Sequence, residues 1–265
     1  MHGTNPKLKV RDKNGIKWRV KLGVEARPET VASRLLWAVG YSTNQFYFLP
    51  SAKVEGLPSH LHRGQNFISP DGTMRNVEMR RKVKTESKIG LWSWRHNPFV
   101  GTRELNGLRV MMALLNNWDL KDDNNAIYEV ERPDHREEDY LVKDLGASFG
   151  TTGLSWTAKK GIGNYESYVH SRFIRKVTPD YVDFNVPTRP ALIVFFNLPE
   201  FIRRLQLRWI GKHIPRADAR WIGQLLAQLS HEQIRDAFRA AGYSPAETEE
   251  YAQAVEARIR GLDDL

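Results

Sequence analysis

The feature that most constrains this fold is a polar segment, residues 117–125, that separates a helical pattern from a hairpin pattern. Residues 102–115 carry apolar side chains at intervals of three and four, which predicts a helix. Residues 126–130 and 140–143 predict two short strands joined by a charged turn. The sequence Asp144-Leu145-Gly146 follows directly. The predicted order is therefore a helix, a polar loop, a hairpin and a second loop that begins with a carboxylate.

Three polar residues in these loops are of the types that phosphoryl transfer to a hydroxyl requires. Such a transfer needs a carboxylate that holds the acceptor hydroxyl in line, and metal ions that neutralise charge on the phosphate oxygens. Asn124 follows Asp119 by five residues, and Asp144 lies 20 residues further on. Asp119 is therefore the candidate base, with Lys121 beside it in the catalytic loop. Asn124 and Asp144 offer the oxygen ligands that Mg²⁺ prefers. The alternative is an ordinary turn, because Asp and Asn side chains bind their own backbone.

A second candidate pair lies near the N-terminus. Residues 16–23 predict a strand preceded by a turn, with Lys21 near its end. A helix is expected from about Pro28 to Val39, with Glu29 in its first turn. A strand lysine that contacts ATP phosphates, paired with a helix glutamate, is the other pair that kinases require. The alternatives are a surface lysine with an apolar stem and a glutamate that stabilises the helix dipole.

With these elements in order, residues 10–150 resemble the HipA-like and phosphatidylinositol-kinase-like branch of atypical kinases. The chain is also similar to a group of bacterial proteins that share its Trp-x-Val-Lys-Leu-Gly and Asn-Asn-Trp-Asp-Leu-Lys stretches. The resemblance implies an α+β, bilobal atypical protein-kinase-like fold that uses ATP and Mg²⁺. It implies that Lys21 contacts the phosphates and Glu29 pairs with it. Asp119 would be the base, and Asn124 and Asp144 the metal ligands.

The chain departs from the family pattern in two places. Asn117 and Trp118 precede the candidate base, where the family has a His or Arg that braces the loop. No Gly-rich phosphate loop precedes Lys21, and only Gly3 and Gly15 lie upstream. Either the start of the small N-terminal lobe is truncated, or a short stretch there forms a reduced cover over the phosphates, or nucleotide binds poorly.

Composition excludes several other classes of protein. The 265 residues include no cysteine, which excludes disulfides and thiolate zinc sites, and the eight histidines lack the spacing of a zinc helix. No apolar run reaches the length of a membrane span, and residues 191–198 are expected to be buried core. Residues 1–15 carry no signal-peptide pattern. The cytoplasm is the default expectation, and a truncated start would leave the compartment open.

The net charge of +9 raises nucleic-acid binding as a third possible function. Most basic residues are dispersed among acidic ones along the sequence, and Trp18, Trp37 and Trp221 lie in apolar contexts that predict core positions. Nucleic acid is therefore the least favoured partner. The favoured partners are a nucleotide and a hydroxyl acceptor, which a protein, a lipid head group or a small molecule could provide. A pseudokinase that retains the fold as a binding module is the second possibility.

Two domains are expected, a β-rich N-lobe over residues 1–88 and a helical C-lobe over residues 89–265. The segment 84–99 is expected to be irregular and to contain the hinge. Residues 146–163 would correspond to an activation-type loop. Two capping boxes, Ser230 with Gln233 and Ser244 with Glu247, predict successive helices in a C-terminal array.

Overall fold

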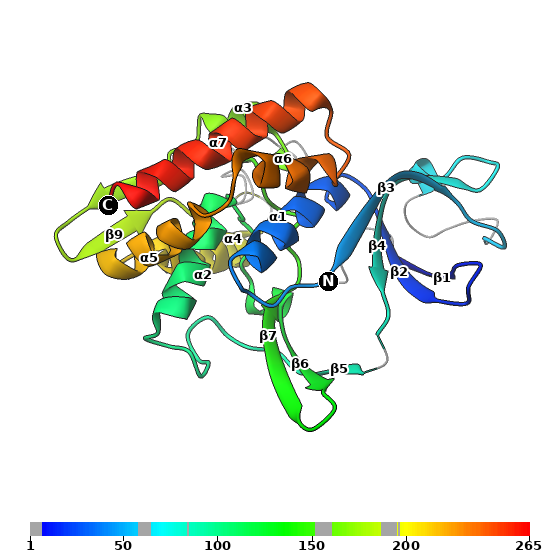
Figure 1. Ribbon diagram of the computed structural model, residues 1–265, viewed down its shortest axis with the longest axis horizontal. Coiled ribbons are helices and arrows are strands. Elements are labelled where there is room, and N and C mark those ends of the chain that lie inside the picture. Colours follow the sequence, from blue (N-terminus) through cyan, green and yellow to red (C-terminus); the bar gives the residue numbers. More distant parts are fainter. Residues whose placement is uncertain (1–6, 58–64, 84, 152–160, 187–194, 196) are drawn as a thin grey trace.

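The computed structural model describes residues 7–57, 65–83, 85–151, 161–186, 195 and 197–265. It is a mixed α/β structure with three antiparallel sheets and helices α1 to α7 in these ranges. Figure 1 shows a four-stranded sheet on one side, the helices on the other, and the β5–β7 sheet below them. No helix among the described residues is long and apolar enough to cross a membrane.

The N-terminal sheet has the strand order β1-β2-β4-β3. Its strands are β1 Lys7–Arg11, β2 Lys17–Leu22, β3 Phe46–Lys53 and β4 Thr73–Arg81. One face is apolar and contains Val20, Leu22 and Val77, all less than 2% exposed. Helix α1, Ala26–Ala38, packs against β3 and β4 and also against α6. Because α1 follows β2 after a short turn, it carries Glu29 back alongside the end of that strand.

Helix α2, Arg103–Leu114, lies at the centre of the main core. Residues Val110 to Leu115 are 0% exposed, and helices that are apolar on all sides are the ones buried in a protein interior. Thr102 caps it, accepting a hydrogen bond from the Leu105 backbone N–H as the sequence predicts. The helix ends at the polar loop, so the buried core anchors the residue immediately before the candidate site.

The hairpin after the loop is longer than predicted. Strands β6, Asn125–Glu131, and β7, Arg136–Val142, pair from Asn125 and Val142 outward. A further strand, β5 Glu86–Gly90, adds to the edge of β6. The prediction that segment 84–99 is wholly irregular is therefore wrong, because its backbone finds a partner strand that is more than 30 residues away. The boundary expected at residue 88 falls inside β5.

The C-terminal part is helical, with a small sheet that the sequence did not reveal. Its helices are α3 Tyr165–Val169, α4 Leu198–Gln206, α5 Arg216–Leu226, α6 His231–Arg239 and α7 Pro245–Asp263. Its strands are β8 Ile174–Val177, β9 Tyr181–Phe184 and β10 Ile214–Pro215, too short to give a clear periodic pattern. Both predicted capping boxes are present at α6 and α7.

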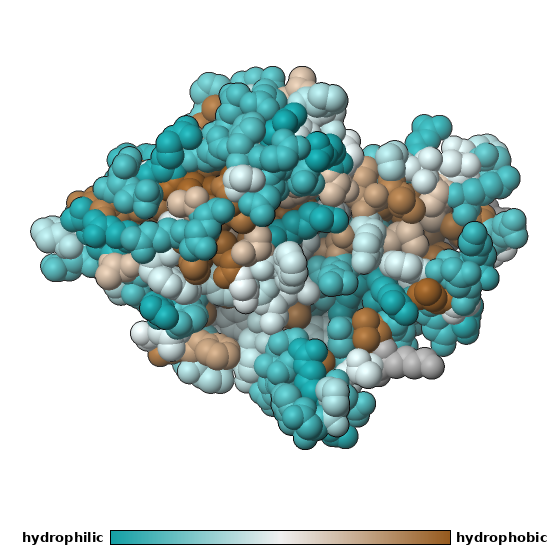
Figure 2. Space-filling view, viewed as in Figure 1, coloured by the Kyte–Doolittle hydropathy of each residue, from teal (hydrophilic) through white to brown (hydrophobic). Residues whose placement is uncertain are grey.

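One prediction about buried apolar residues, that for Trp37, is wrong, and another is contradicted at the two apolar residues of its segment that the structure describes. Trp37 is 69% exposed, because it lies on the side of α1 that faces away from the sheet and from α6. Trp18 and Trp221 are half-buried. Most of segment 191–198 lies outside the described residues, but Phe195 and Leu198 are 77% and 52% exposed and therefore not core. On the face shown in Figure 2, hydrophilic side chains cover α7 and the tip of the β6–β7 hairpin.

Candidate functional site

Lys21 lies at the centre of the candidate site, surrounded by carboxylates. Its Nζ is 2.5 Å from Glu29 Oε2, 2.8 Å from Glu25 Oε2 and 3.1 Å from Asp144 Oδ1. The contacts with Glu29 and Asp144 are hydrogen bonds, and the contact with Glu25 is an ion pair. The structure therefore brings together Lys21, Glu29 and Asp144, three of the predicted site residues, across 123 residues of sequence.

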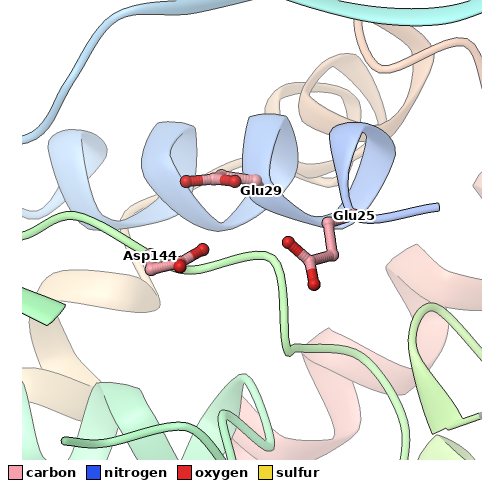
Figure 3. A group of neighbouring side chains, drawn as sticks. All are labelled: Glu25, Glu29 and Asp144. Carbon is pink, nitrogen blue, oxygen red and sulfur yellow. The ribbon is translucent and has the colours of Figure 1, made fainter. Parts of the chain in front are cut away.

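The carboxylates come from two different elements, as Figure 3 shows. Glu29 projects from the first turn of α1, and Glu25 is the residue immediately before that helix. Asp144 projects toward them from the loop that follows β7. The three carboxylates approach one another within 4.8 Å, a spacing that could hold a metal ion. The ammonium of Lys21 is already bound to all three, so here the cluster serves as the ligand shell of the lysine.

The glycine of the Asp-Leu-Gly sequence is explained by this packing. A Cβ on Gly146 would lie 2.6 Å from the Cβ and 3.2 Å from the backbone oxygen of Glu25. Leu145 is 1% exposed and fixes the loop in the main core. Any side chain at position 146 would push the start of α1 away from Asp144, so the glycine permits the close approach.

The polar loop that contains Asp119 is held by its own side chains. The backbone N–H of Asp119 donates to Asn117 Oδ1 at 2.9 Å, and Asn124 Nδ2 donates to the backbone oxygen of Asp119 at 2.7 Å. Lys121 Nζ lies 3.4 Å from Asp119 Oδ1. These contacts agree with the turn interpretation, and they also hold the carboxylate of Asp119 beside a cation, as the catalytic interpretation expects.

The loop and the Asp-Leu-Gly segment lie side by side. The backbone N–H of Lys143 donates to the oxygen of Asn124 at 2.8 Å, and that of Trp118 donates to the oxygen of Ala147 at 3.2 Å. The first residue of β6, Asn125, pairs with the last residue of β7, Val142. This pairing brings Asn124, which precedes β6, next to Lys143, which precedes Asp144. All six predicted site residues therefore belong to two adjoining clusters.

Arg258 braces the end of α2, just before the polar loop. It is 7% exposed, and its guanidinium donates to the backbone oxygens of Leu114 and Tyr168, both at 2.8 Å. It also donates to Asn116 Oδ1 at 3.0 Å. Asn116 has a φ of 54°, the left-handed conformation that turns the chain from α2 into the loop. Sequence analysis missed Arg258 because it lies more than 130 residues from the loop.

Two further site residues were missed, Glu25 and Glu78. Glu78 on β4 lies directly across from Lys21 in the sheet register and is 4% exposed. Its Oε2 has no hydrogen-bond partner among the described residues. No signal in the sequence marks Glu78, because a polar residue is ordinary between Val77 and Met79 in a strand with one apolar face. Only the pairing of β2 with β4 puts it beside Lys21.

Burial and crowding shift the pKa values in this cluster. Burial lowers the pKa of Lys21, but the carboxylates of Glu29, Asp144 and Glu25 outweigh it and hold that pKa well above its usual range. Burial raises the pKa of Glu29 to about 7, against the attraction of Lys21. Burial and the neighbouring Glu29 also raise the pKa of Glu78 well above its usual range. The raised pKa of Lys21 is compatible with the raised pKa values of Glu29 and Glu78, because several carboxylates share a single ammonium.

A second group of cations adjoins Asp144. Burial lowers the pKa of Lys143 to about 8, and the ammonium groups of Lys88 and Lys7 lower it further. The candidate site therefore has two sides, a cluster of carboxylates around Lys21 and a cluster of lysines next to it.

The donor set near the hairpin fits Mg²⁺. Asp144 uses Oδ1 for Lys21, and no bond to its other oxygen is observed among the described residues. Asn124 turns its NH₂ group toward Asp119, which leaves Oδ1 as its outward acceptor. One carboxylate oxygen and one amide oxygen, completed by water and phosphate, are ligands that Mg²⁺ accepts. Asn124 and Asp144 could therefore hold the ion together with a bound nucleotide.

The turn at Gly15 is not placed to cover phosphates at Lys21. It joins β1 to β2 at one end of the hairpin, whereas Lys21 lies at the other end, opposite Lys7. Lys21 follows Gly15 by six residues, which corresponds to about 20 Å along an extended strand. The stretch that contains Gly3 lies outside the described residues.

Comparison with known proteins supports the fold alone. No protein-family model and no curated protein matches the chain. Among solved structures, it is similar to the proinflammatory kinase CtkA of Helicobacter pylori. The two are 11% identical, the match covers 100% of this chain and 92% of that one, and the TM-score is 0.51. The chain has a kinase-like fold.

Proposed function

We propose that this protein is an ATP- and Mg²⁺-dependent phosphotransferase of the atypical, HipA-like kinase type. The observation that carries the proposal is the contact of Lys21 with both Glu29 and Asp144. In a bilobal kinase, the strand lysine, the helix glutamate and the metal-binding aspartate must lie together around the phosphates. The kinase-like neighbour supports the same arrangement at the level of the fold.

Each residue would have one role in the transfer. Lys21 would bind phosphate oxygens, held in place by Glu29. Asp119, with Lys121 beside it, would accept the proton of the acceptor hydroxyl or orient that hydroxyl in line with the γ-phosphorus. Bound Mg²⁺, held by Asn124 and Asp144, would neutralise charge on the phosphates. The acceptor could be a hydroxyl of a protein, a lipid head group or a small molecule.

A radiolabelled-phosphate transfer assay tests the enzymatic proposal. Asp119→Ala and Asp144→Ala should each lower turnover by at least about a hundredfold, because general-base and electrostatic contributions are of that order. Asp134→Ala is the matched control, since its side chain is 83% exposed in the hairpin turn. Equal residual activity in the parent and all three variants would refute the proposal.

A pseudokinase is the second candidate, and one observation favours it. Three carboxylates surround the ammonium of Lys21, and two of them accept its hydrogen bonds, so the phosphates of a nucleotide must compete with these carboxylates for the lysine. Thermal unfolding with Mg²⁺ and ATP separates the two candidates in part, because a ligand that binds only the folded state raises the melting temperature. The absence of a shift at millimolar ATP would favour the binding-module interpretation.

A further inference from the structure

Glu78 is a buried carboxyl group on the strand next to Lys21, and the proposed transfer gives it no role. The pairing of β2 with β4 places it directly opposite Lys21, so the two side chains leave the same face of the sheet. Its neighbour on the other side, Phe48 of β3, carries no charge. Glu78 is 4% exposed and Glu29 is 2% exposed. Strand pairing and helix α1 therefore bring two buried carboxyl groups to one ammonium.

The groups around Glu78 supply too little positive charge for an ionised carboxylate. Lys21 faces it from β2, and Glu29 of α1 and Asp144 of the loop after β7 are the negative groups that act on it. Lys21 already forms hydrogen bonds with Glu29 and Asp144 and an ion pair with Glu25. One ammonium therefore faces four carboxyl groups, of which Glu29 and Glu78 are the most deeply buried.

This environment favours the protonated form of Glu78. In the described part of the chain, no N–H or O–H group donates to its Oε2. A buried carboxylate without donors is strongly unfavourable, so such a group retains its proton instead. Burial, the charge of Glu29 and a hydrogen bond with Glu29 raise the pKa of Glu78 well above its usual range, against the attraction of Lys21. The protonated form has an O–H group, and Glu29 is the acceptor that contacts it.

We propose that Glu78 is a positioning residue whose carboxylic acid donates a hydrogen bond to Glu29 and so fixes Glu29 against Lys21. Glu29 Oε2 lies 2.5 Å from Lys21 Nζ, so Glu29 links the lysine to a donor on the neighbouring strand. With one shared proton, the two carboxyl groups carry one negative charge, which matches the one ammonium. Asp144 and Glu25 are then not needed to neutralise the lysine, and phosphates can replace them. The role in nucleotide binding rests on the proposed phosphotransfer, whereas the shared proton does not.

Infrared difference spectroscopy tests the position of the proton without any nucleotide. A carboxylic acid and an ionised carboxylate absorb at different stretching frequencies, so one buried acid is visible among ionised side chains. Spectra are taken at about pH 8, where Glu29, with a pKa of about 7, is mostly ionised. The difference between the parent and Glu78→Gln should contain a carboxylic acid band. The difference between the parent and Glu104→Gln, a control at an exposed glutamate, should contain none. Absence of the band in the first difference would overturn the proposal.

Calorimetric titration with Mg²⁺-ATP tests the positioning role. Glu78→Gln retains an N–H donor for Glu29, so it should bind Mg²⁺-ATP within about twofold of the parent affinity. Glu78→Met fills a similar space without a donor. It should weaken binding by about tenfold or more, because hydrogen bonds to charged groups are among the stronger ones. Both variants remove the same acid, so retention of binding by the amide alone identifies the hydrogen bond to Glu29 as the cause.

Val77→Ala is the matched control for the packing of β4. Val77 is 0% exposed and packs on the opposite, apolar face of the sheet, so its truncation should lower the melting temperature and leave the affinity for Mg²⁺-ATP unchanged. An affinity loss in Val77→Ala equal to that in Glu78→Met would overturn the positioning role, as would equal affinities of Glu78→Met and Glu78→Gln. If the parent binds no Mg²⁺-ATP, the proposed function fails together with the positioning role, and the infrared spectra still decide whether Glu78 holds the proton.

Discussion

Replacing Arg258 with Met should destabilise the whole fold, because this buried guanidinium joins α7 to the end of α2. It makes five hydrogen bonds, to the backbone oxygens of Ala113, Leu114 and Tyr168 and to the side chains of Asn116 and Ser171. Its Cζ lies 3.8 Å from the centre of the Tyr168 ring. In the described part of the chain, no carboxylate pairs with it, so backbone oxygens and this ring are what stabilise its charge.

The magnitude follows from which groups the substitution leaves unsatisfied. Leu114 and Tyr168 keep other donors to their oxygens, the Tyr168 hydroxyl at 2.8 Å and the Ser171 hydroxyl at 2.6 Å. Asn116 Oδ1 loses its donor, which costs about 1–3 kcal/mol for a buried acceptor. The buried cation–π contact adds about 2 kcal/mol. Burial lowers the pKa of Arg258, which shows that desolvation of its charge has a cost. Met carries no charge, so the absence of this cost partly offsets the destabilisation. We expect a net destabilisation of about 2–4 kcal/mol.

Thermal unfolding measures this effect directly. A change of 1 kcal/mol shifts the melting temperature of a protein of this size by about 2–4 °C, so Arg258→Met should melt about 4–16 °C below the parent. Arg260→Met is the matched control on the same helix, because its side chain is 68% exposed and its nearest carboxylate, Glu256, lies 3.9 Å away. Equal melting temperatures for the two variants would show that Arg258 does not hold the loop in place.

Glu25→Gln should strengthen binding of Mg²⁺-ATP by up to about tenfold, because it removes one of the carboxylates that compete with phosphate for the ammonium of Lys21. Unchanged or weaker binding by calorimetry would contradict this. Glu29 should make folding less stable as the pH rises from about 4.5 to about 7, because the folded protein retains a proton there that the unfolded chain releases. In urea titrations, the free energy of unfolding of the parent should fall by about 3 kcal/mol relative to that of Glu29→Gln between pH 4.5 and pH 7. A difference between the two proteins that does not change with pH would disprove the raised pKa of Glu29. Gly146→Ala should lower stability by about 1–3 kcal/mol, since its Cβ would overlap Glu25, and an unchanged denaturation midpoint would argue against this packing.

Local signals in the sequence were sufficient for the elements around the site. The spacing of apolar residues located α2, and the capping residues Thr102, Ser230 and Ser244 marked the starts of three helices. These signals act within one helical turn, so they do not depend on how the rest of the chain packs. The strands β5 and β8 to β10 were missed because their stability comes from partners distant in sequence rather than from their own residues.

The arrangement of surface charge also depends partly on the sequence and partly on strand pairing. Counted along the sequence, basic and acidic residues are interspersed, which argued against a nucleic-acid surface. In the folded hairpin, alternation sends Lys9, Arg11, Lys17 and Arg19 to one side, and pairing of β1 with β2 aligns them. Alternation was present in the sequence, but which cations become neighbours depends on the register, and a slip of one residue would have changed it.

The sequence by itself determined the order of the helix, loop and hairpin, and the residue types that Mg²⁺ and phosphate chemistry need. Only the tertiary structure decided that Lys21 faces three carboxylates, that Glu78 lies behind it, and that Arg258 braces the loop. The physical reason is distance along the chain. Capping and periodicity act between residues a few positions apart, whereas the charges of the site come from segments more than 100 residues apart that meet only when the core is packed.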